Sequence, residues 1–213
     1  MDFLDEKLED YVNAHTSSES EVLSDLNRQT HINVLQPRML SGHLQGRTLS
    51  LFSKMLQPNR ILEIGTYTGY SAICLAEGLQ ESGKIITIDV NYELEEMVKE
   101  YVEKAGFSEK IEMKVGNAME IIPTLDKNFD LVFIDADKSN YSNYYDLLID
   151  HLPKGAIMIA DNVLWSGKVV EPVKKNDIDT EALKVFNLKI QEDDRVENVL
   201  LPIRDGLMMI RKK

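Results

Sequence analysis

The chain has 213 residues, of which 43% are hydrophobic and 28% are charged. This length and composition fit one ordinary globular domain and are too small for us to expect two. The net charge of −12, from 36 acidic and 24 basic residues, makes nucleic acid a possible but disfavoured partner, because phosphate backbones are repelled at long range.

The sequence shows no sign of membrane insertion or secretion. No apolar run approaches the roughly 20 residues that a membrane-spanning helix needs. The first residues, MDFLDEKLED, are acidic and amphipathic, unlike the basic and then apolar start of a secretory signal. We therefore expect a cytoplasmic protein. Its one cysteine, Cys74, lies among apolar residues, and we expect a buried, unreactive thiol.

The first part of the chain has helical patterns. Apolar residues recur at helical spacing near its start, namely Phe3, Leu4, Leu8, Tyr11 and Val12. Two further helices are expected over residues 18–35 and 41–56, separated at Gln36 and Pro37 because a proline cannot continue a helix. We interpret residues 1–56 as a helical extension of a single domain that spans residues 1–213.

From residue 60 onward, strands and helices alternate. Five short apolar runs predict buried strands, over residues 60–65, 84–90, 111–116, 129–136 and 155–162. The segments between them, such as 92–105 and 140–151, are long enough for crossover helices, so these strands should be parallel. Residues 196–202 and 206–212 also predict strands, but the gap between them is so short that they must form an antiparallel hairpin. The expected fold is α/β, with a seven-stranded, mostly parallel, Rossmann-like sheet, a C-terminal antiparallel hairpin and helices on both faces.

In such folds, ligands bind beyond the carboxyl ends of the strands. After the first strand, Gly65 and Gly69 permit a tight turn, and their spacing differs from the G-x-G-x-x-G of NAD sites. Asp89 ends the second strand, where an acid can accept hydrogen bonds from both ribose hydroxyls. The third strand ends at Gly116-Asn117-Ala118, a turn that can offer backbone amides to an adenine edge. S-Adenosylmethionine, which has no pyrophosphate, fits this pattern, and a solvated loop acid is the alternative for Asp89.

The fourth and fifth strands end in polar residues at the same edge of the sheet. Asp135 follows one strand, and Asp161 and Asn162 follow the next. If the two strands are neighbours, these side chains can converge, and two carboxylates with an amide oxygen suit Mg²⁺, Mn²⁺ or Ca²⁺ rather than zinc. The alternative is that these acids cap the following helices. Lys138 is a candidate general base because a nearby divalent cation favours the neutral amine, although most lysines are solvated surface charges.

Four segments carry a resemblance to a known family: ILEIGTYTGYS (61–71), IDADKSNYSNYY (134–145), ADNVLWSGKV (160–169) and DDRVENVLLPIRDGLMMIRK (193–212). With them the sequence resembles the cation-dependent O-methyltransferases, the family of caffeoyl-CoA and catechol O-methyltransferases, which have the seven-stranded sheet of class I methyltransferases. The resemblance runs from about Met39 to the C-terminus. The pair IDADK and DNVLWSG is close to a signature of this family.

The resemblance implies a role for individual residues. It implies that Asp135, Asp161 and Asn162 hold the metal and that Lys138 is the catalytic base. It places the following residues around the cofactor: Met39, Ser41, Glu63, Gly65, Tyr67, Ser71, Asp89, Ala118 and Asp135. Those that it implies for the substrate are Met39, Lys138 and Trp165. The family tail often reads GDG, whereas here Arg204 precedes Asp205 and Gly206.

The function that follows is a transferase of class EC 2.1.1. It would use S-adenosylmethionine and a divalent cation, Mg²⁺ or Mn²⁺ or Ca²⁺, to methylate a small aromatic molecule with vicinal hydroxyls, and a homodimer is expected as in relatives. Some bacterial relatives methylate 5-hydroxyuridine in transfer RNA, an alternative that the net charge of −12 disfavours. A non-catalytic cofactor-binding module is a remote alternative, because all three implied metal ligands and Lys138 are present.

Overall fold

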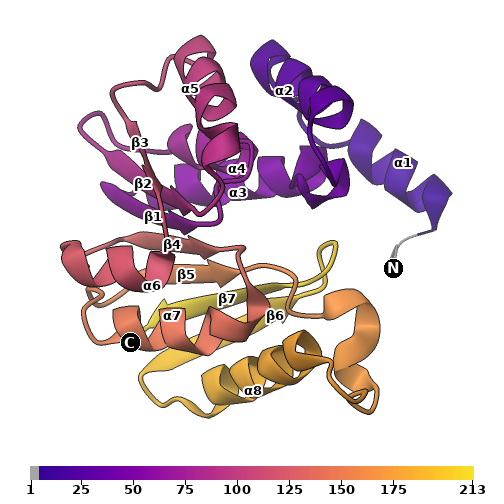
Figure 1. Cartoon of the computed structure of the whole chain (residues 1–213), viewed down its shortest axis with the longest axis vertical. Coiled ribbons are helices and arrows are strands. Elements are labelled where there is room, and N and C mark those ends of the chain that lie inside the picture. Colours follow the sequence, from indigo (N-terminus) through magenta and orange to yellow (C-terminus); the bar gives the residue numbers. More distant parts are fainter. Residues whose placement is uncertain (1–4) are drawn as a thin grey trace. The chain divides into compact units, whose positions relative to one another are not determined.

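The computed structural model describes residues 5–213. These residues form a seven-stranded sheet in the order β3-β2-β1-β4-β5-β7-β6, mostly parallel and with an antiparallel hairpin at the end of the chain (Figure 1). The predicted fold class is therefore confirmed. The described residues group into two compact units, one that ends at Asn117 and one that begins at Ala118. That the chain is a single domain stays a prediction.

The first unit contains three parallel strands, β1 (Arg60–Ile64), β2 (Lys84–Asp89) and β3 (Ile111–Val115). Their register pairs Ile61 with Ile85 and Ile85 with Ile111, so the three apolar runs predicted as strands lie side by side. Helices α4 (Tyr70–Ala76) and α5 (Glu95–Lys104) connect these strands. Both are crossover helices of the kind that parallel neighbours require.

Among the residues described before β1, three α-helices are found: α1 (Glu6–Ala14), α2 (Glu21–Asn33) and α3 (Gly42–Leu56). The predicted N-terminal helices are thus confirmed, although Phe3 and Leu4 lie outside the described residues. Ser20 caps α2, because its hydroxyl accepts a hydrogen bond from the backbone N–H of Leu23. A 3₁₀ turn at Pro37–Met39 separates α2 from α3, at the proline that predicts the break.

Helix α3 packs closely on α4. A Cβ atom at Gly46 would lie 2.5 Å from the ring of Tyr70 and 2.9 Å from the sulfur of Cys74, so only glycine fits at this position. Cys74 is fully buried, as predicted, and burial raises the pKa of its thiol to about 12. The thiol is therefore protonated at neutral pH and unreactive.

A cluster of charged groups around Glu77 also joins α3 to the end of α4. Arg47 donates to both carboxylate oxygens at 2.8 and 3.0 Å, Lys54 Nζ donates at 2.7 Å and Ser50 Oγ donates at 2.6 Å. Burial opposes ionisation of Glu77, but the hydrogen bonds from Arg47, Lys54 and Ser50 outweigh it and lower the pKa of Glu77 to about 2.

The second unit contains β4 (Leu131–Ile134), β5 (Ile157–Ala160), β6 (Val196–Leu201) and β7 (Leu207–Lys212). Strands β4 and β5 are parallel neighbours, and β7 lies antiparallel between β5 and β6, which confirms the predicted hairpin. The helices are α6 (Ala118–Ile121), α7 (Tyr141–Ile149) and α8 (Ile178–Glu192). Helix α8, which packs against α7, is not among the predicted helices.

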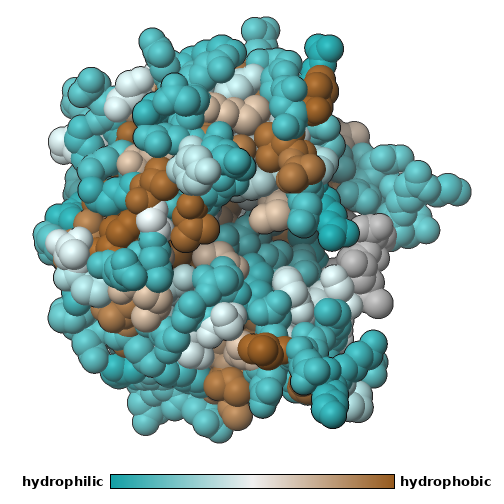
Figure 2. Space-filling view, in the orientation of Figure 1, coloured by the Kyte–Doolittle hydropathy of each residue, from teal (hydrophilic) through white to brown (hydrophobic). Residues whose placement is uncertain are grey.

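Within residues 5–213, no helix combines the length and hydropathy needed to cross a bilayer. Figure 2 shows a face on which hydrophilic side chains predominate, in keeping with the net charge of −12. The large aromatic side chains of Tyr70, Tyr141, Phe133 and Phe186 are instead fully buried in the cores of their units.

The charged cluster predicts how stability depends on pH. Because the pKa of Glu77 is about 2 in the folded chain and 4.5 ordinarily, its contribution is complete above about pH 4.5 and is lost as the pH falls toward 2. Glu77→Gln should lower the free energy of unfolding at pH 7 by about 1–3 kcal/mol. Urea unfolding of both proteins should show this difference shrink between pH 4.5 and pH 2. Glu96→Gln, at a solvent-exposed ion pair, is the control and should change little.

Candidate functional site

The turn after β1, residues 65–69, has an unusual backbone. Gly65 and Gly69 have φ values of 100° and 88°, in the left-handed region that favours glycine. The backbone N–H of Gly65 donates to the carbonyl of Ile88 at 2.8 Å, so this turn lies beside the end of β2. Tyr67 also has a positive φ, 49°, which costs a residue other than glycine about 1–3 kcal/mol. Such strain persists only where surrounding contacts hold the residue in place.

Asp89, the last residue of β2, supplies one of these contacts. One of its carboxylate oxygens accepts a hydrogen bond from the N–H of Tyr67 at 2.7 Å, and the other accepts from the N–H of Asn91 at 2.8 Å. A carboxylate has about four acceptor positions, so Asp89 keeps capacity for the ribose hydroxyls predicted to bind there. The N–H of Gly116 donates to the Asp89 carbonyl at 2.8 Å, which places the tip of β3 at the same edge.

The other residues predicted to contact the cofactor lie on several elements. Glu63 is fully buried in β1, and its Oε2 accepts from the hydroxyl of Thr87 at 2.5 Å. In the first unit, Ser71 is buried in α4, Ser41 is buried at the start of α3, and Met39 lies exposed in the 3₁₀ turn. In the second unit, Ala118 is the buried first residue of α6. Their contacts with a cofactor stay predictions.

In the second unit, two polar strand ends lie side by side. The register of β4 and β5 pairs Ile134 with Ala160, so Asp135 and Asp161 directly follow paired residues. The predicted convergence depends on these strands being neighbours, and that part is confirmed. Asp161 is 2% exposed, and its Oδ1 accepts from the N–H of Asn162 at 2.6 Å.

Lys138 joins two of the predicted metal ligands. Its Nζ donates to Oδ1 of Asp135 at 3.0 Å and to Oδ1 of Asn162 at 2.7 Å. The third partner of Nζ is the hydroxyl of Tyr141, at 2.8 Å. With 8% of its surface exposed, Lys138 is no solvated surface lysine. The oxygens of Asp135 and Asn162 thus converge on one cationic atom.

The kinds of oxygen atom in the predicted ligand set indicate which metal ions they suit. Among residues 5–213, no group of three or more His, Cys, Asp and Glu side chains could hold a metal ion. The predicted set has only two carboxylates, those of Asp135 and Asp161, and takes its third oxygen from the amide of Asn162. Carboxylate and amide oxygens suit Mg²⁺, Mn²⁺ and Ca²⁺. The metal assignment stays a prediction.

Trp165 lies beside this cluster. Its backbone N–H donates to the carbonyl of Asn162 at 3.1 Å, and its ring centroid lies 5.8 Å from Lys138 Nζ and 5.5 Å from Lys168 Nζ. The indole Nε1 is buried and has no hydrogen-bond partner within the described chain. A buried donor without a partner is costly, and a bound molecule with an acceptor atom would satisfy it. This arrangement is consistent with the predicted contact between Trp165 and substrate.

Sequence reasoning assigns no role to Tyr141, although its hydroxyl is central to this cluster. The hydroxyl lies 2.8 Å from Lys138 Nζ and donates to the carbonyl of Asp161 at 3.0 Å. Burial, with nearby carboxylates, raises the pKa of Tyr141 well above its ordinary value, so the hydroxyl keeps its proton. The spacing of three residues from Lys138 to Tyr141 is a signal that could have identified it, because such residues are neighbours on a helix.

A second residue without a predicted role is Asp205, in the hairpin loop between β6 and β7. Its Oδ1 accepts a hydrogen bond from the backbone N–H of Ser166 at 2.5 Å, which ties the loop to the residue after Trp165. Burial raises the pKa of the Asp205 carboxyl. No spacing in the sequence connects residue 205 with residue 166, so this contact could not have been predicted.

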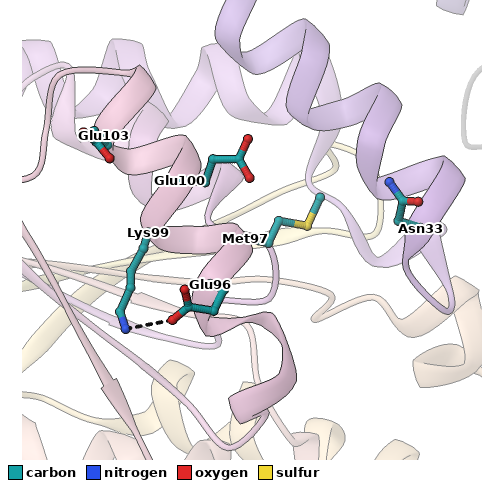
Figure 3. Close-up of a pocket in the computed structure, with 6 residues that line it drawn as sticks. All are labelled: Asn33, Glu96, Met97, Lys99, Glu100 and Glu103. Carbon is teal, nitrogen blue, oxygen red and sulfur yellow. Dashed lines mark hydrogen bonds and ion pairs between the residues drawn. The ribbon is translucent and has the colours of Figure 1, made fainter.

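A shallow groove between α2 and α5 differs from the cluster around Lys138 in the side chains that line it. Its volume is about 520 Å³, and it is lined by Asn33, Glu96, Met97, Lys99, Glu100 and Glu103 (Figure 3). Figure 3 shows Lys99 paired with Glu96 along the surface of α5 rather than pointing toward α2. These are solvated helix-surface charges, and the groove carries no converging polar groups of the kind found around Lys138.

Sequence comparison identifies relatives over most of the chain. The sequence model of a protein family described as O-methyltransferase matches residues 13–213. Caffeoyl-CoA O-methyltransferase 1 of Zea mays is 37% identical over 179 residues, which cover 79% of this chain and 69% of that protein. Caffeoyl-CoA O-methyltransferase 2 of Eucalyptus globulus is 36% identical over 179 residues, covering 79% of this chain and 72% of that protein.

Solved structures of O-methyltransferases are also similar to this chain. The O-methyltransferase of Bacillus cereus in complex with S-adenosylhomocysteine is 26% identical, covers 97% of each chain and has a TM-score of 0.89. The O-methyltransferase TomG of Streptomyces achromogenes, involved in tomaymycin synthesis and in complex with S-adenosylmethionine, is 29% identical. It matches with a TM-score of 0.89 over 97% of this chain and 96% of that one.

Proposed function

This chain belongs to the O-methyltransferase family, and we propose that it methylates a hydroxyl of a catechol-type aromatic molecule with the help of a divalent cation. It is an S-adenosylmethionine-dependent methyltransferase of the caffeoyl-CoA O-methyltransferase type, with relatives that hold S-adenosylmethionine or S-adenosylhomocysteine. A caffeoyl group carries two vicinal hydroxyls, so the names of these relatives support an acceptor of this kind. The acceptor and the cation are the parts that we propose.

The observation that carries this proposal is the position of Lys138 Nζ between two oxygens, at 3.0 Å from Asp135 Oδ1 and 2.7 Å from Asn162 Oδ1. The ammonium group stands in for a cation here, because it is held by the same oxygens that are proposed as metal ligands. Hard divalent cations take such oxygens in preference to nitrogen or sulfur. The residues therefore fit the proposed metal, with Asp161 as the third ligand.

Each proposed role follows from the chemistry of the groups. When bound, S-adenosylmethionine supplies the methyl group and the cation polarises the acceptor hydroxyl. Asp89 accepts hydrogen bonds from the ribose hydroxyls and so holds the cofactor in place. Lys138, as the neutral amine that a bound cation would favour, accepts the proton of the acceptor hydroxyl at Nζ, and Tyr141 fixes the position of that nitrogen through its hydroxyl. Trp165 lines the acceptor site.

The proposed cation predicts that activity is lost with chelator and restored by Mg²⁺. The decisive assay offers purified enzyme catechols, caffeoyl esters and 5-hydroxyuridine transfer RNA, with and without EDTA. We expect Mg²⁺-dependent methylation of the small aromatic acceptors. Asp161→Asn should weaken Mn²⁺ binding, measured by calorimetry, at least tenfold, because it removes a charged ligand from a nearly fully buried position.

The matched control for the metal is Asp137→Asn. The carboxylate of Asp137 accepts hydrogen bonds from Tyr144 and Asn140 and is outside the proposed ligand set, so Mn²⁺ affinity should not change. Full turnover in excess EDTA would contradict the cation. Methylation of the transfer RNA alone would contradict the proposed acceptor and leave the enzyme class intact.

The proposed base predicts that Lys138→Ala and Lys138→Arg both lower kcat by about 10²–10⁴-fold. Arginine keeps the positive charge beside Asp135, but a guanidinium cannot accept a proton at neutral pH. Affinity for S-adenosylhomocysteine, measured by calorimetry, should be nearly unchanged in both variants. The control is Lys189→Arg, since Lys189 is paired with Asp146 on the surface. Wild-type kcat in Lys138→Arg would show that Lys138 acts only through its charge.

We also propose that the enzyme is a homodimer that associates through its N-terminal helices. Helix α1 buries none of its residues, and it exposes Leu8 and Tyr11, while α3 exposes Leu51 and Met55 one turn apart. Apolar side chains gathered on neighbouring helices are typical of a subunit interface.

Light scattering should therefore give twice the chain mass of 24.3 kDa at micromolar concentration. The double variant Leu51→Glu, Met55→Glu should be a monomer, because association would bury the introduced charges. Val185→Glu with Leu188→Glu, at equally exposed positions of α8, is the matched control and should stay dimeric. A wild-type mass of one chain would contradict the proposed assembly.

A further inference from the structure

The segment that joins α2 to α3, residues 34–41, has little packing of its own, and we call it the strap. It contains the 3₁₀ turn Pro37–Met39 and follows Asn33, which Figure 3 shows at the end of α2. Leu35 is 90% exposed and Met39 is 55% exposed, and burial in this fully described segment is confined to Leu40 and Ser41 at its end. Hydrophobic contacts therefore do little to hold the first part of the strap.

A tyrosine side chain is hydrogen-bonded to that part of the strap. The hydroxyl of Tyr67 donates to the carbonyl oxygens of Leu35, at 3.2 Å, and Gln36, at 3.3 Å. Gln36 has a φ of 59°, in the left-handed region, so the chain turns sharply where it meets this hydroxyl. Partial burial raises the pKa of Tyr67, so the hydroxyl stays a donor at any physiological pH.

The backbone of the same tyrosine belongs to the turn after β1. Its N–H donates to Asp89, the proposed ribose ligand, at 2.7 Å. Tyr67 therefore connects the strap, through its hydroxyl, with Asp89, through its amide. Its left-handed backbone conformation, with φ of 49°, is held from both sides by these contacts.

A second hydrogen bond joins the turn after β1 to α2, and this one is buried. Thr30 Oγ1 donates to Thr68 Oγ1 at 3.2 Å, and both residues are fully buried. Breaking that bond would leave two buried hydroxyl groups without hydrogen-bond partners, which costs free energy. The bond of Tyr67 to the strap is at the surface, where water can replace it. The strap can therefore open at Tyr67 while α2 stays attached at Thr68.

We propose that Tyr67 is a positioning residue whose hydroxyl latches the strap against the turn after β1, and that this latch retains the bound cofactor. The inference rests on the proposed placement of S-adenosylmethionine at this turn. With the latch closed, the strap blocks departure of the cofactor. Removing this hydrogen bond shifts such an equilibrium by about twofold to tenfold.

The variant Tyr67→Phe removes only the hydroxyl and keeps the ring. We expect the amides of Met39 and Leu40 to exchange with solvent about two to ten times faster, measured by hydrogen exchange in the absence of cofactor. Dissociation of S-adenosylhomocysteine, measured by stopped flow, should accelerate by a similar factor. The KM for S-adenosylmethionine should rise while the urea midpoint stays nearly constant, a pattern that general destabilisation would not produce.

The matched control is Tyr101→Phe, which removes a hydroxyl that donates to Asp25 of α2 at 2.6 Å, away from the strap. It should leave the exchange of the strap amides unchanged. A second variant, Gln36→Val, changes the residue whose carbonyl accepts the hydrogen bond of Tyr67. It disfavours the turn, because β-branched residues avoid the left-handed region of backbone conformation. It should have the same effects as Tyr67→Phe, and the double variant should add little to either.

The outcomes separate the latch from the proposed function. Unchanged strap exchange in Tyr67→Phe would overturn the latch, whether or not the cofactor binds. Faster strap exchange with an unchanged dissociation rate would overturn its role in retaining the cofactor. If wild-type protein bound no S-adenosylhomocysteine at all, the proposed placement of the cofactor would fail, and with it the inference that the latch retains it.

Discussion

The constraint on which the rest of the structure depends is that the central strands are buried on both faces. Strand β4 is buried along its whole length, and β1 and β5 are buried except at their first residues. Polar side chains that must reach a ligand are therefore expected at the last residue of a strand or directly after it. Asp89, Asp135 and Asp161 all lie at such ends. Glu63 is the exception, and a hydrogen bond from Thr87 compensates its burial inside β1.

This constraint explains why the strands and their polar carboxyl ends could be predicted from the sequence. Apolar runs followed at once by Asp or Asn identify both the strand and its polar end, and the three-residue gap before Gly206 identifies the hairpin. The predicted strands extend two residues beyond each end of β4 (Leu131–Ile134) and β5 (Ile157–Ala160), and the polar residues at the carboxyl ends belong to the loops. Helix α8 was missed, since its exposed Val185 and Leu188 blur the apolar periodicity that identifies an amphipathic helix.

Side-chain contacts could be predicted less well than strand ends. Spacing alone placed Lys138 near Asp135, but its contacts with Asn162 and Tyr141 depend on the pairing of β4 with β5 and on the turn into α7. Contacts between segments far apart in the sequence have no local signal. The bond of Tyr67 to the carbonyl of Gln36 and that of Asp205 to Ser166 both involve backbone atoms, and any residue could stand at the accepting or donating position. Such contacts require the folded chain.

The two tyrosines at these sites show how burial assigns different tasks to the same side chain. Tyr141 is fully buried, and its hydroxyl contacts Lys138 and the carbonyl of Asp161, so displacing it would leave buried polar groups without partners. The proposed role of Tyr141, which is to hold the nitrogen of Lys138 in one place, benefits from that cost. The hydroxyl of Tyr67 lies at the surface, where water can replace the protein carbonyls at little cost. The proposed latch requires such a weak bond, because each product molecule has to leave before the next cofactor binds.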